Sequence, residues 1–98
     1  MARTLHERFE AVNDEYIKFE NIENPPTNRA DLCAFLLLDK LVPSERPNDI
    51  VLCSEHDEIW LDIDAEKLNA VATDDDILFL TRCGVGYDSD RDALSMFV

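Results

Sequence analysis

The sequence predicts an α+β fold, with two long helices and two short helices packed on about four antiparallel strands. Residues 5–22 and 30–42 carry apolar side chains at helical spacing. Residues 50–63 contain two short apolar runs separated by a polar turn, which is the pattern of a β-hairpin. With 98 residues and 46% hydrophobic content, the chain has enough apolar material for the core of one domain spanning residues 1–98.

The first predicted helix spans residues 5–22. Thr4 and Glu7 stand three residues apart, as the N-cap and the glutamate of a capping box do. Behind them, apolar residues return every three or four positions and form one stripe: Leu5, Phe9, Val12, Tyr16 and Phe19. Asn24-Pro25-Pro26 ends the helix because proline cannot continue it.

The second predicted helix, residues 30–42, is the most apolar stretch of the chain. Leucine, alanine and cysteine dominate it, and no β-branched residue precedes Val42, which favours helix over strand. Asn28 is the expected N-cap, and Pro43 ends the helix. Apolar residues surround most of the helix, so we expect it to be buried on more than one side, with the rest of the chain packed around it. It is too short to span a bilayer, which takes about 20 residues.

A β-hairpin follows. Ile50–Cys53 forms its first strand, residues 54–58 form a polar turn, and Ile59–Ile63 forms the second strand. In the second strand Ile59, Leu61 and Ile63 face one way, while Trp60 and Asp62 face the other.

The remaining elements have clear boundary signals. Asp64 is the expected N-cap of a short helix over residues 65–72. Thr73 and Asp76 repeat the capping pattern at the start of a helix that runs to Cys83, and Gly84 fits its C′ position. Residues 85–87 and 93–98 flank an acidic turn, so they predict a terminal hairpin.

The charge balance restricts the partners of this protein. It has 22 acidic against 9 basic residues, a net charge of -13. Residues 49–98 hold 13 of the acids and only Lys67, Arg82 and Arg91 as bases. Direct binding to nucleic acid is disfavoured because phosphate contacts need Lys and Arg, whereas a basic protein would be attracted. The N-terminal residues have no signal-peptide pattern, and the three widely spaced cysteines are expected to be reduced and mostly buried, which indicates a cytoplasmic protein.

Three short patterns resemble parts of metal or catalytic sites. Asp88, Asp90 and Asp92 have the spacing of a calcium loop, but Ala93 replaces the required glycine, so a solvated turn is expected. Asp74-Asp75-Asp76 cannot converge on one ion from consecutive helical positions, so the three predict a charged helix start. Cys53 and His56 lack the further ligands of a zinc site. We therefore expect no cofactor, no metal and no catalytic residue.

Trp60 has two interpretations. It either fills the core, or it is an interface anchor on an open face ringed by Asp57, Asp62 and Asp64 and extended by Tyr87. In the second case the acids of the later half would form the binding surface around it. The candidate residues are Glu55, Asp57, Glu58, Trp60, Asp62, Asp64, Asp74, Asp75, Asp76, Tyr87, Asp88, Asp90 and Asp92.

The chain resembles small acidic proteins carried by bacteriophages and prophages. The resemblance lies in Asp31-Leu-Cys-Ala-Phe-Leu-Leu-Leu-Asp39, Glu55-His-Asp-Glu-Ile59, Arg82-Cys-Gly-Val-Gly-Tyr-Asp88 and Met96-Phe-Val98. None of these strings is a functional motif. The resemblance implies a host-cell context in which such proteins bind and block host proteins, including nucleic-acid-handling defence complexes such as CRISPR effectors.

Three functions follow from these observations. The favoured one is a non-enzymatic acidic protein that docks on a basic, nucleic-acid-binding surface of a host protein, as an inhibitor and a mimic of nucleic acid. The alternative reading of the excess acid is that it only aids solubility. The second function is a structural or assembly subunit that self-associates through the terminal strand. The third is an enzyme, for which the neighbourhood of Cys53 and His56 is the least unsuitable site.

Overall fold

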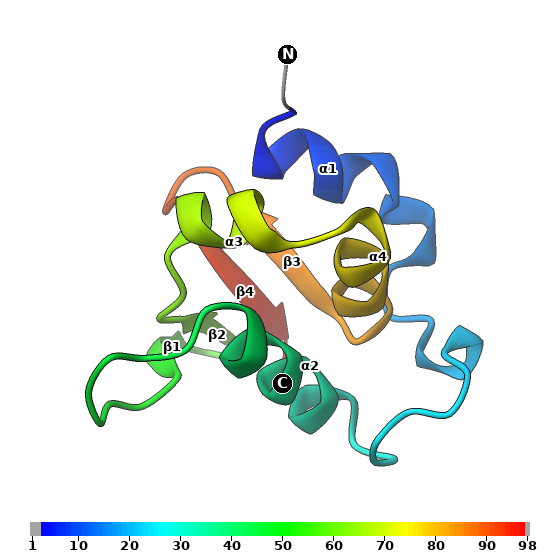
Figure 1. The fold of residues 1–98 in the computed structure, drawn as a ribbon, viewed down its shortest axis with the longest axis horizontal. Helices are drawn as coiled ribbons and strands as arrows, with labels where there is room; N and C mark the ends of the chain where they lie inside the picture. Colours follow the sequence, from blue (N-terminus) through cyan, green and yellow to red (C-terminus); the bar gives the residue numbers. More distant parts are fainter. Residues whose placement is uncertain (1–2, 98) are drawn as a thin grey trace.

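The computed structural model describes residues 3–97 and has the predicted α+β fold (Figure 1). Four α-helices accompany a four-stranded antiparallel sheet. In chain order the elements are α1 (Leu5–Ala11), α2 (Ala30–Leu41), β1 (Val51–Glu55), β2 (Glu58–Leu61), α3 (Ala65–Val71), α4 (Asp74–Arg82), β3 (Val85–Asp88) and β4 (Ala93–Phe97). Val98, the last residue of the predicted final strand, lies outside the described residues.

Helix α1 is much shorter than predicted. Its capping box forms, with the Glu7 N–H donating to Thr4 Oγ1 over 3.2 Å. The helix ends at Ala11, so the prediction of a helix up to residue 22 is wrong from Val12 onward; two short 3₁₀ turns follow. Contacts with α4 hold this segment in a non-helical conformation, although its apolar stripe favours a helix. Ile17 takes a positive φ of 63°, and its N–H donates to the Thr81 carbonyl over 3.1 Å.

Helix α2 has nearly the predicted bounds but not the predicted cap or burial. Arg29, rather than Asn28, is the N-cap, and no side chain caps the helix there. Cys33, Ala34 and Leu38 are buried in the core. Leu32 and Leu36 on the other side are 41% and 50% exposed, so the expectation of burial on more than one side is wrong.

The sheet has the strand order β1-β2-β4-β3, and every neighbouring pair is antiparallel. Both predicted hairpins are present, although the first turn is shorter than expected and consists of His56 and Asp57. Strand β4 lies between β2 and β3, so both of its edges already form hydrogen bonds. The expectation that copies associate through the terminal strand is therefore wrong, because neither edge of β4 is free.

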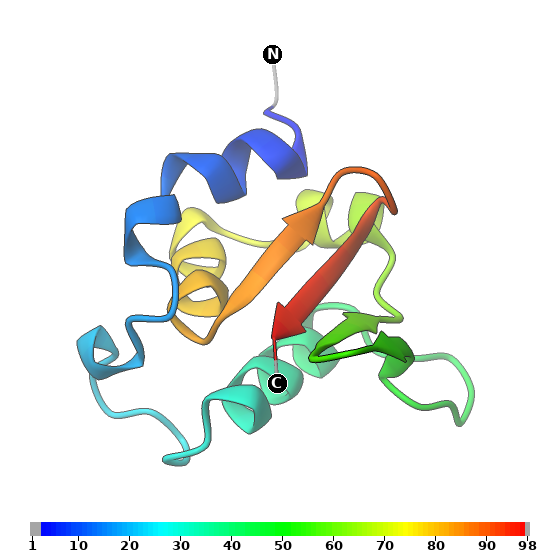
Figure 2. The same ribbon diagram turned by 180° about the vertical axis from the view of Figure 1, so that it is seen from behind.

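The helices α2, α3 and α4 form one layer on one face of the sheet. They lie in front of the strands in Figure 1, and β3 and β4 lie in front of them in Figure 2. The core between the two layers contains Leu61, Ile63, Leu94 and Met96 from the sheet side. The alternation predicted for β2 holds, because Leu61 joins this core while Trp60 points to the opposite face.

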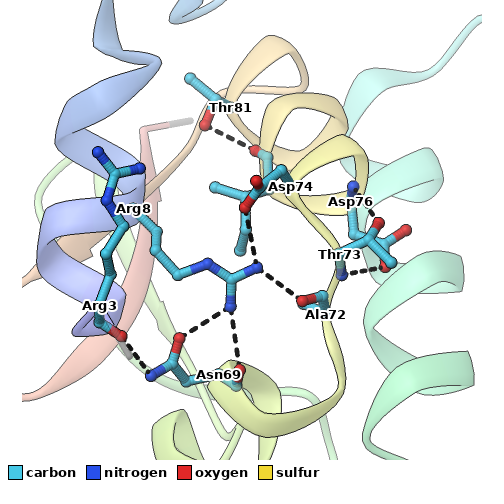
Figure 3. Close-up of polar contacts among 9 residues, drawn as sticks. Arg3, Arg8, Asn69, Ala72, Thr73, Asp74, Asp76 and Thr81 are labelled. Carbon is cyan, nitrogen blue, oxygen red and sulfur yellow. Dashed lines mark hydrogen bonds and ion pairs between the residues drawn. The ribbon is translucent and has the colours of Figure 1, made fainter. Parts of the chain in front are cut away.

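Arg8, on α1, contacts both α3 and α4 (Figure 3). One guanidinium nitrogen donates to the Asn69 carbonyl over 3.0 Å, and the other donates to the Ala72 carbonyl over 2.6 Å. These carbonyls belong to the last turn and C-cap of α3, which have no partner within their own helix. Arg8 therefore stabilises the α3–α4 corner. Unlike the cap expected at α2, the caps expected at the later helices form, with Asp64 at α3, Thr73 and Asp76 at α4, and Gly84 at φ 96° after α4.

Candidate functional site

The predicted acidic residues lie in separate places on the fold. The β1–β2 hairpin carries Glu55, Asp57 and Glu58, and the β3–β4 hairpin carries Asp88, Asp90 and Asp92. In the register of β2 with β4, Glu58 pairs with Phe97 and Leu61 pairs with Leu94. Because the two turns adjoin opposite ends of this strand pair, Asp57 lies at the end away from Asp90 and Asp92, and the carboxylates do not form one ridge. Glu55 and Asp88 are the exception, since Arg91 bridges them. Asp74, Asp75 and Asp76 begin α4, in the helical layer.

Two acidic segments lie at the same end of the fold. Helix α3 and the β3–β4 turn are both at the upper left of the ribbon in Figure 1 and at the upper right in Figure 2. These segments carry exposed carboxylates, which we call the acidic end: Asp64, Glu66, Asp90 and Asp92. Asp64 is held in place as the cap of α3, since its Oδ1 accepts the N–H groups of Glu66 and Lys67 at 3.0 and 3.2 Å. The acidic end is therefore a surface built on a capped helix and a tight turn.

A hollow of about 330 Å³ extends the acidic end toward the end of α2. Asp39, Glu45, Asp62 and Asp64 contribute carboxylates to its lining, and Arg46 and Lys67 contribute the positive charges. Asp62 is oriented by a hydrogen bond of 2.9 Å from the side-chain amide of Asn48. In the lining of this hollow, too, acidic side chains outnumber basic ones.

Trp60 is covered rather than open. Only 5% of its surface is exposed, and it lies outside the main core cluster, on the sheet face away from the helices. Arg91 covers it, with the guanidinium carbon 4.0 Å from the ring centroid, a cation–π contact. The predicted rim of Asp57, Asp62 and Asp64 does not form around it; instead Arg91 pairs with Glu55 at 3.1 Å and with Asp88 at 3.9 Å.

Tyr87 does not extend the surface around Trp60. On β4, Ser95 pairs with Trp60 and the neighbouring Leu94 pairs with Tyr87, so the two aromatic side chains point to opposite faces of the sheet. Tyr87 packs against the core and donates a hydrogen bond from its hydroxyl to Oδ1 of Asp92. This hydrogen bond is the main reason that the pKa of Tyr87 is raised to about 12.

The three aspartates at the start of α4 have three different environments. Asp74 lies 3.4 Å from Arg8, and Asp76 accepts the Thr73 N–H at 2.9 Å as part of the capping box (Figure 3). Asp75 is exposed and accepts no hydrogen bond within residues 3–97. The expected charged helix start is present.

Few of the carboxylates are neutralised by a neighbouring cation. Of the 22 acidic residues, those within ion-pair distance of Lys or Arg in the described part of the chain are Glu15, Glu55, Asp74 and Asp88. Arg82 lies 2.7 Å from Glu15 and lowers the pKa of that carboxyl below its ordinary value. Arg91 is occupied by Glu55 and Asp88, so Lys67 is the one base of residues 49–98 that forms no ion pair among the described residues.

The three cysteines differ in exposure. Cys53 is exposed on β1, and His56 lies in the next turn at φ 56°. Cys33 and Cys83 are buried, and burial raises the pKa of Cys83 to about 12. Across residues 3–97 no three histidine, cysteine or carboxylate side chains group closely enough to hold a metal ion.

Some features of the surface were not expected from the sequence. The contact of Arg91 with Trp60 joins the β3–β4 turn to β2, which is distant in the chain, and no local sequence pattern predicts it. The exposure of Leu36 on α2 was missed because the helix looked apolar all round. The available signal was that Leu32 and Leu36 share their side of the helix with the charged residues Asp39 and Lys40.

No protein-family model, curated protein or solved structure matches this chain. In the part of the chain that the structure describes, none of the helices has the length and apolar character needed to cross a membrane.

Proposed function

We propose that this protein is a non-enzymatic acidic binding protein that docks its acidic end on a basic surface of a host protein. The observation that supports the proposal is that no Lys or Arg of the described residues forms an ion pair with Asp64, Glu66, Asp90 or Asp92. Lys67, which follows Glu66 in the chain, is a single base beside these four acids. Unpaired exposed charges of one sign attract a partner of the opposite sign and speed the encounter. Arg91, the nearest arginine in sequence, is engaged at Trp60 and does not neutralise its two neighbours in the turn.

The most specific form of the proposal is mimicry of nucleic acid. A protein surface that binds DNA presents Lys and Arg to phosphates spaced about 1.7 Å apart along the helix axis, counting both strands. Carboxylates on a rigid support can occupy the same sites, and an inhibitor of a nucleic-acid-handling host complex, such as a CRISPR effector, would work in this way. The capped start of α3 and the hydrogen bond from Tyr87 to Asp92 provide a rigid support. This is the role that the resemblance to small phage proteins implies, and it places the protein in the host cytoplasm.

The test is capture from a nuclease-treated bacterial lysate on the immobilised protein. We expect a basic nucleic-acid-binding protein to be retained at low salt, released at high salt and displaced by a short DNA duplex. Salt sensitivity follows from the screening of exposed charges. The proposal fails if the retained proteins are the same as on an unrelated protein of equal negative charge, or if DNA displaces none of them.

A second function, that of an assembly subunit, is favoured by strand β1. All five of its residues are exposed, and the strand order leaves its outer edge unpaired within the described residues. Leu52 on this strand is 60% exposed. Unpaired strand edges join other strands, so copies of this chain would associate through β1 rather than β4. Sedimentation of the wild type and of Leu52→Lys would distinguish docking from assembly. An assembly through β1 should be present in the wild type and lost in the variant.

A further inference from the structure

Helices α2 and α4 form the two walls of an apolar groove of about 510 Å³. From α2, Cys33, Leu36, Leu37 and Lys40 line it, at the three- and four-residue spacing of one helix face. From α4, Phe79 is the apolar side chain and Asp75 and Asp76 form the rim. Leu36 is half exposed although it lines the groove, so its apolar surface has no cover in the described part of the chain.

The rim of the groove carries unpaired charges of opposite sign. Asp75 on the α4 side and Lys40 on the α2 side are both exposed, and no ion pair joins them to each other or to another described residue. An apolar floor with a charged rim is the usual composition of a protein interface. The charges also set a direction, because an occupant needs a cation toward α4 and an anion toward α2.

The groove reaches across α4 to a second hollow. Asp75 and Phe79 line both, and the second hollow adds the apolar Ile22 and Leu78 and the polar Asn21, Glu23 and Arg82. The second hollow is therefore a more polar continuation of the first, and Asp75 is shared by the two.

The nature of the walls selects the form of the occupant. The backbone N–H and C=O groups in the middle of a helix are bonded within that helix, so α2 and α4 offer none to a guest. An extended strand placed there would bury backbone groups without partners, which costs free energy. A helix satisfies its own backbone and presents only side chains, as helices bound in apolar grooves do.

We propose that the α2–α4 groove binds an amphipathic helix of another protein. That helix carries a stripe of leucine-like side chains, with Lys or Arg along the edge facing Asp75 and Asp or Glu along the edge facing Lys40. Leu36 makes the main apolar contact with the bound helix, and Asp75 fixes the orientation of that helix by attracting its basic edge. The inference goes beyond the docking function proposed above and does not depend on it, because the acidic end and the groove share no residue.

The test uses designed helical peptides of about 18 residues, long enough to form a helix on binding. One peptide has leucines at i, i+3, i+4 and i+7, with lysines along one edge and glutamates along the other. A second has the same composition with the leucines distributed around the helix. Titration into ¹⁵N-labelled protein should shift amides of α2 and α4 with the first peptide only.

Two variants identify the groove as the site. Leu36→Ala should raise the Kd of the first peptide at least about fivefold, as loss of a central apolar contact does. Asp75→Asn should reduce the preference for that peptide over a version with its lysines replaced by glutamines, whereas Lys40 continues to attract the glutamate edge. Val71→Ala, an exposed change on α3, is the matched control and should leave the Kd unchanged.

The inference is overturned if no peptide shifts an amide, if the shifts fall on β1 or the acidic end, or if the peptide with distributed leucines binds equally well. It is also overturned if Leu36→Ala and Val71→Ala have the same effect. Since the groove and the acidic end are tested with different probes, failure of one does not decide the other.

Discussion

The indole Nε1 of Trp60 donates a hydrogen bond of 3.0 Å to Oδ2 of Asp88. This contact connects β2 to the last residue of β3 across the intervening strand β4. The second oxygen of Asp88 accepts the Asp90 N–H over 3.0 Å, so one carboxylate organises both the tryptophan and the turn that carries the acidic residues. The hydrogen bond from Trp60 is the main cause that lowers the pKa of Asp88 below its ordinary value of 3.8.

Asp88→Asn should weaken the dependence of folding stability on acidic pH. A carboxylate whose pKa is lowered by folding stabilises the protein above its unfolded pKa and loses that contribution as pH falls through the folded pKa. In the wild type we therefore expect the free energy of unfolding to decrease as the pH is lowered past 3.8. Glu7 and Glu15 act in the same direction, so the variant should retain part of the dependence.

Urea denaturation followed by Trp60 fluorescence at a series of pH values measures this effect. Asp57→Asn removes an exposed turn carboxylate and is the matched control, which should keep the wild-type dependence. Equal pH curves for wild type and Asp88→Asn would contradict the assigned role of Asp88.

Arg8→Ala should destabilise the protein by about 2–3 kcal/mol, because it leaves carbonyls at the end of α3 without partners. The side chain of Arg8 is only 11% exposed and donates to the carbonyls of Asn69 and Ala72. Arg46→Ala, in the exposed loop before β1, should stay within about 0.5 kcal/mol of wild type. Thermal and urea unfolding measure the stability of both variants. Equal stability of Arg8→Ala and Arg46→Ala would contradict a stabilising role for the Arg8 hydrogen bonds.

Gly84→Ala should cost about 1–2 kcal/mol, since a side chain at positive φ is strained. Gly84 has a φ of 96°, and an added Cβ would lie 3.3 Å from Cγ1 of Ile17. Gly86→Ala is the control, because its added Cβ would lie 3.9 Å from the Tyr16 ring, an ordinary contact. Urea midpoints that are lowered equally in both variants would show that position 84 has no special backbone requirement.

Thiol labelling of the folded protein should modify Cys53 alone. Cys53 is exposed, whereas Cys33 and Cys83 are only 1% and 4% exposed. Burial also raises the pKa of Cys83 to about 12, and the thiolate is the reactive form. Mass spectrometry after brief alkylation should find one modified cysteine in wild type and none in Cys53→Ser. Rapid modification of Cys83 without denaturant would contradict the buried position.

Local features could be predicted from the sequence. The capping residues Thr4, Asp64 and Thr73 and the C′ glycine Gly84 act through their near neighbours in the chain, and all four do so in the structure. The two hairpins were likewise predictable, because alternation and a short turn determine each one.

Features that depend on distant contacts could not be predicted. The apolar stripe of residues 5–19 reads as a continuous helix, yet the hydrogen bond from Ile17 to Thr81 turns the chain away. The grouping of the acids depends on the pairing of β2 with β4, which places the two acidic turns at opposite ends. Exposure of acidic side chains was foreseeable from their chemistry, but their division among the hairpins, α3 and α4 was not.

The account depends most on the acidic end, and the affinity of the captured host protein for matched charge variants tests it most directly. One variant combines Asp64→Asn, Glu66→Gln, Asp90→Asn and Asp92→Asn, which keep the helix cap and the turn. The control combines Glu10→Gln, Asp14→Asn, Glu20→Gln and Glu23→Gln, which removes the same charge from exposed positions in another part of the chain. At low salt we predict that the first variant raises the Kd at least about tenfold, while the control changes it by less than about threefold. Equal changes in both variants, or no change in the first, would contradict a specific docking role for the acidic end.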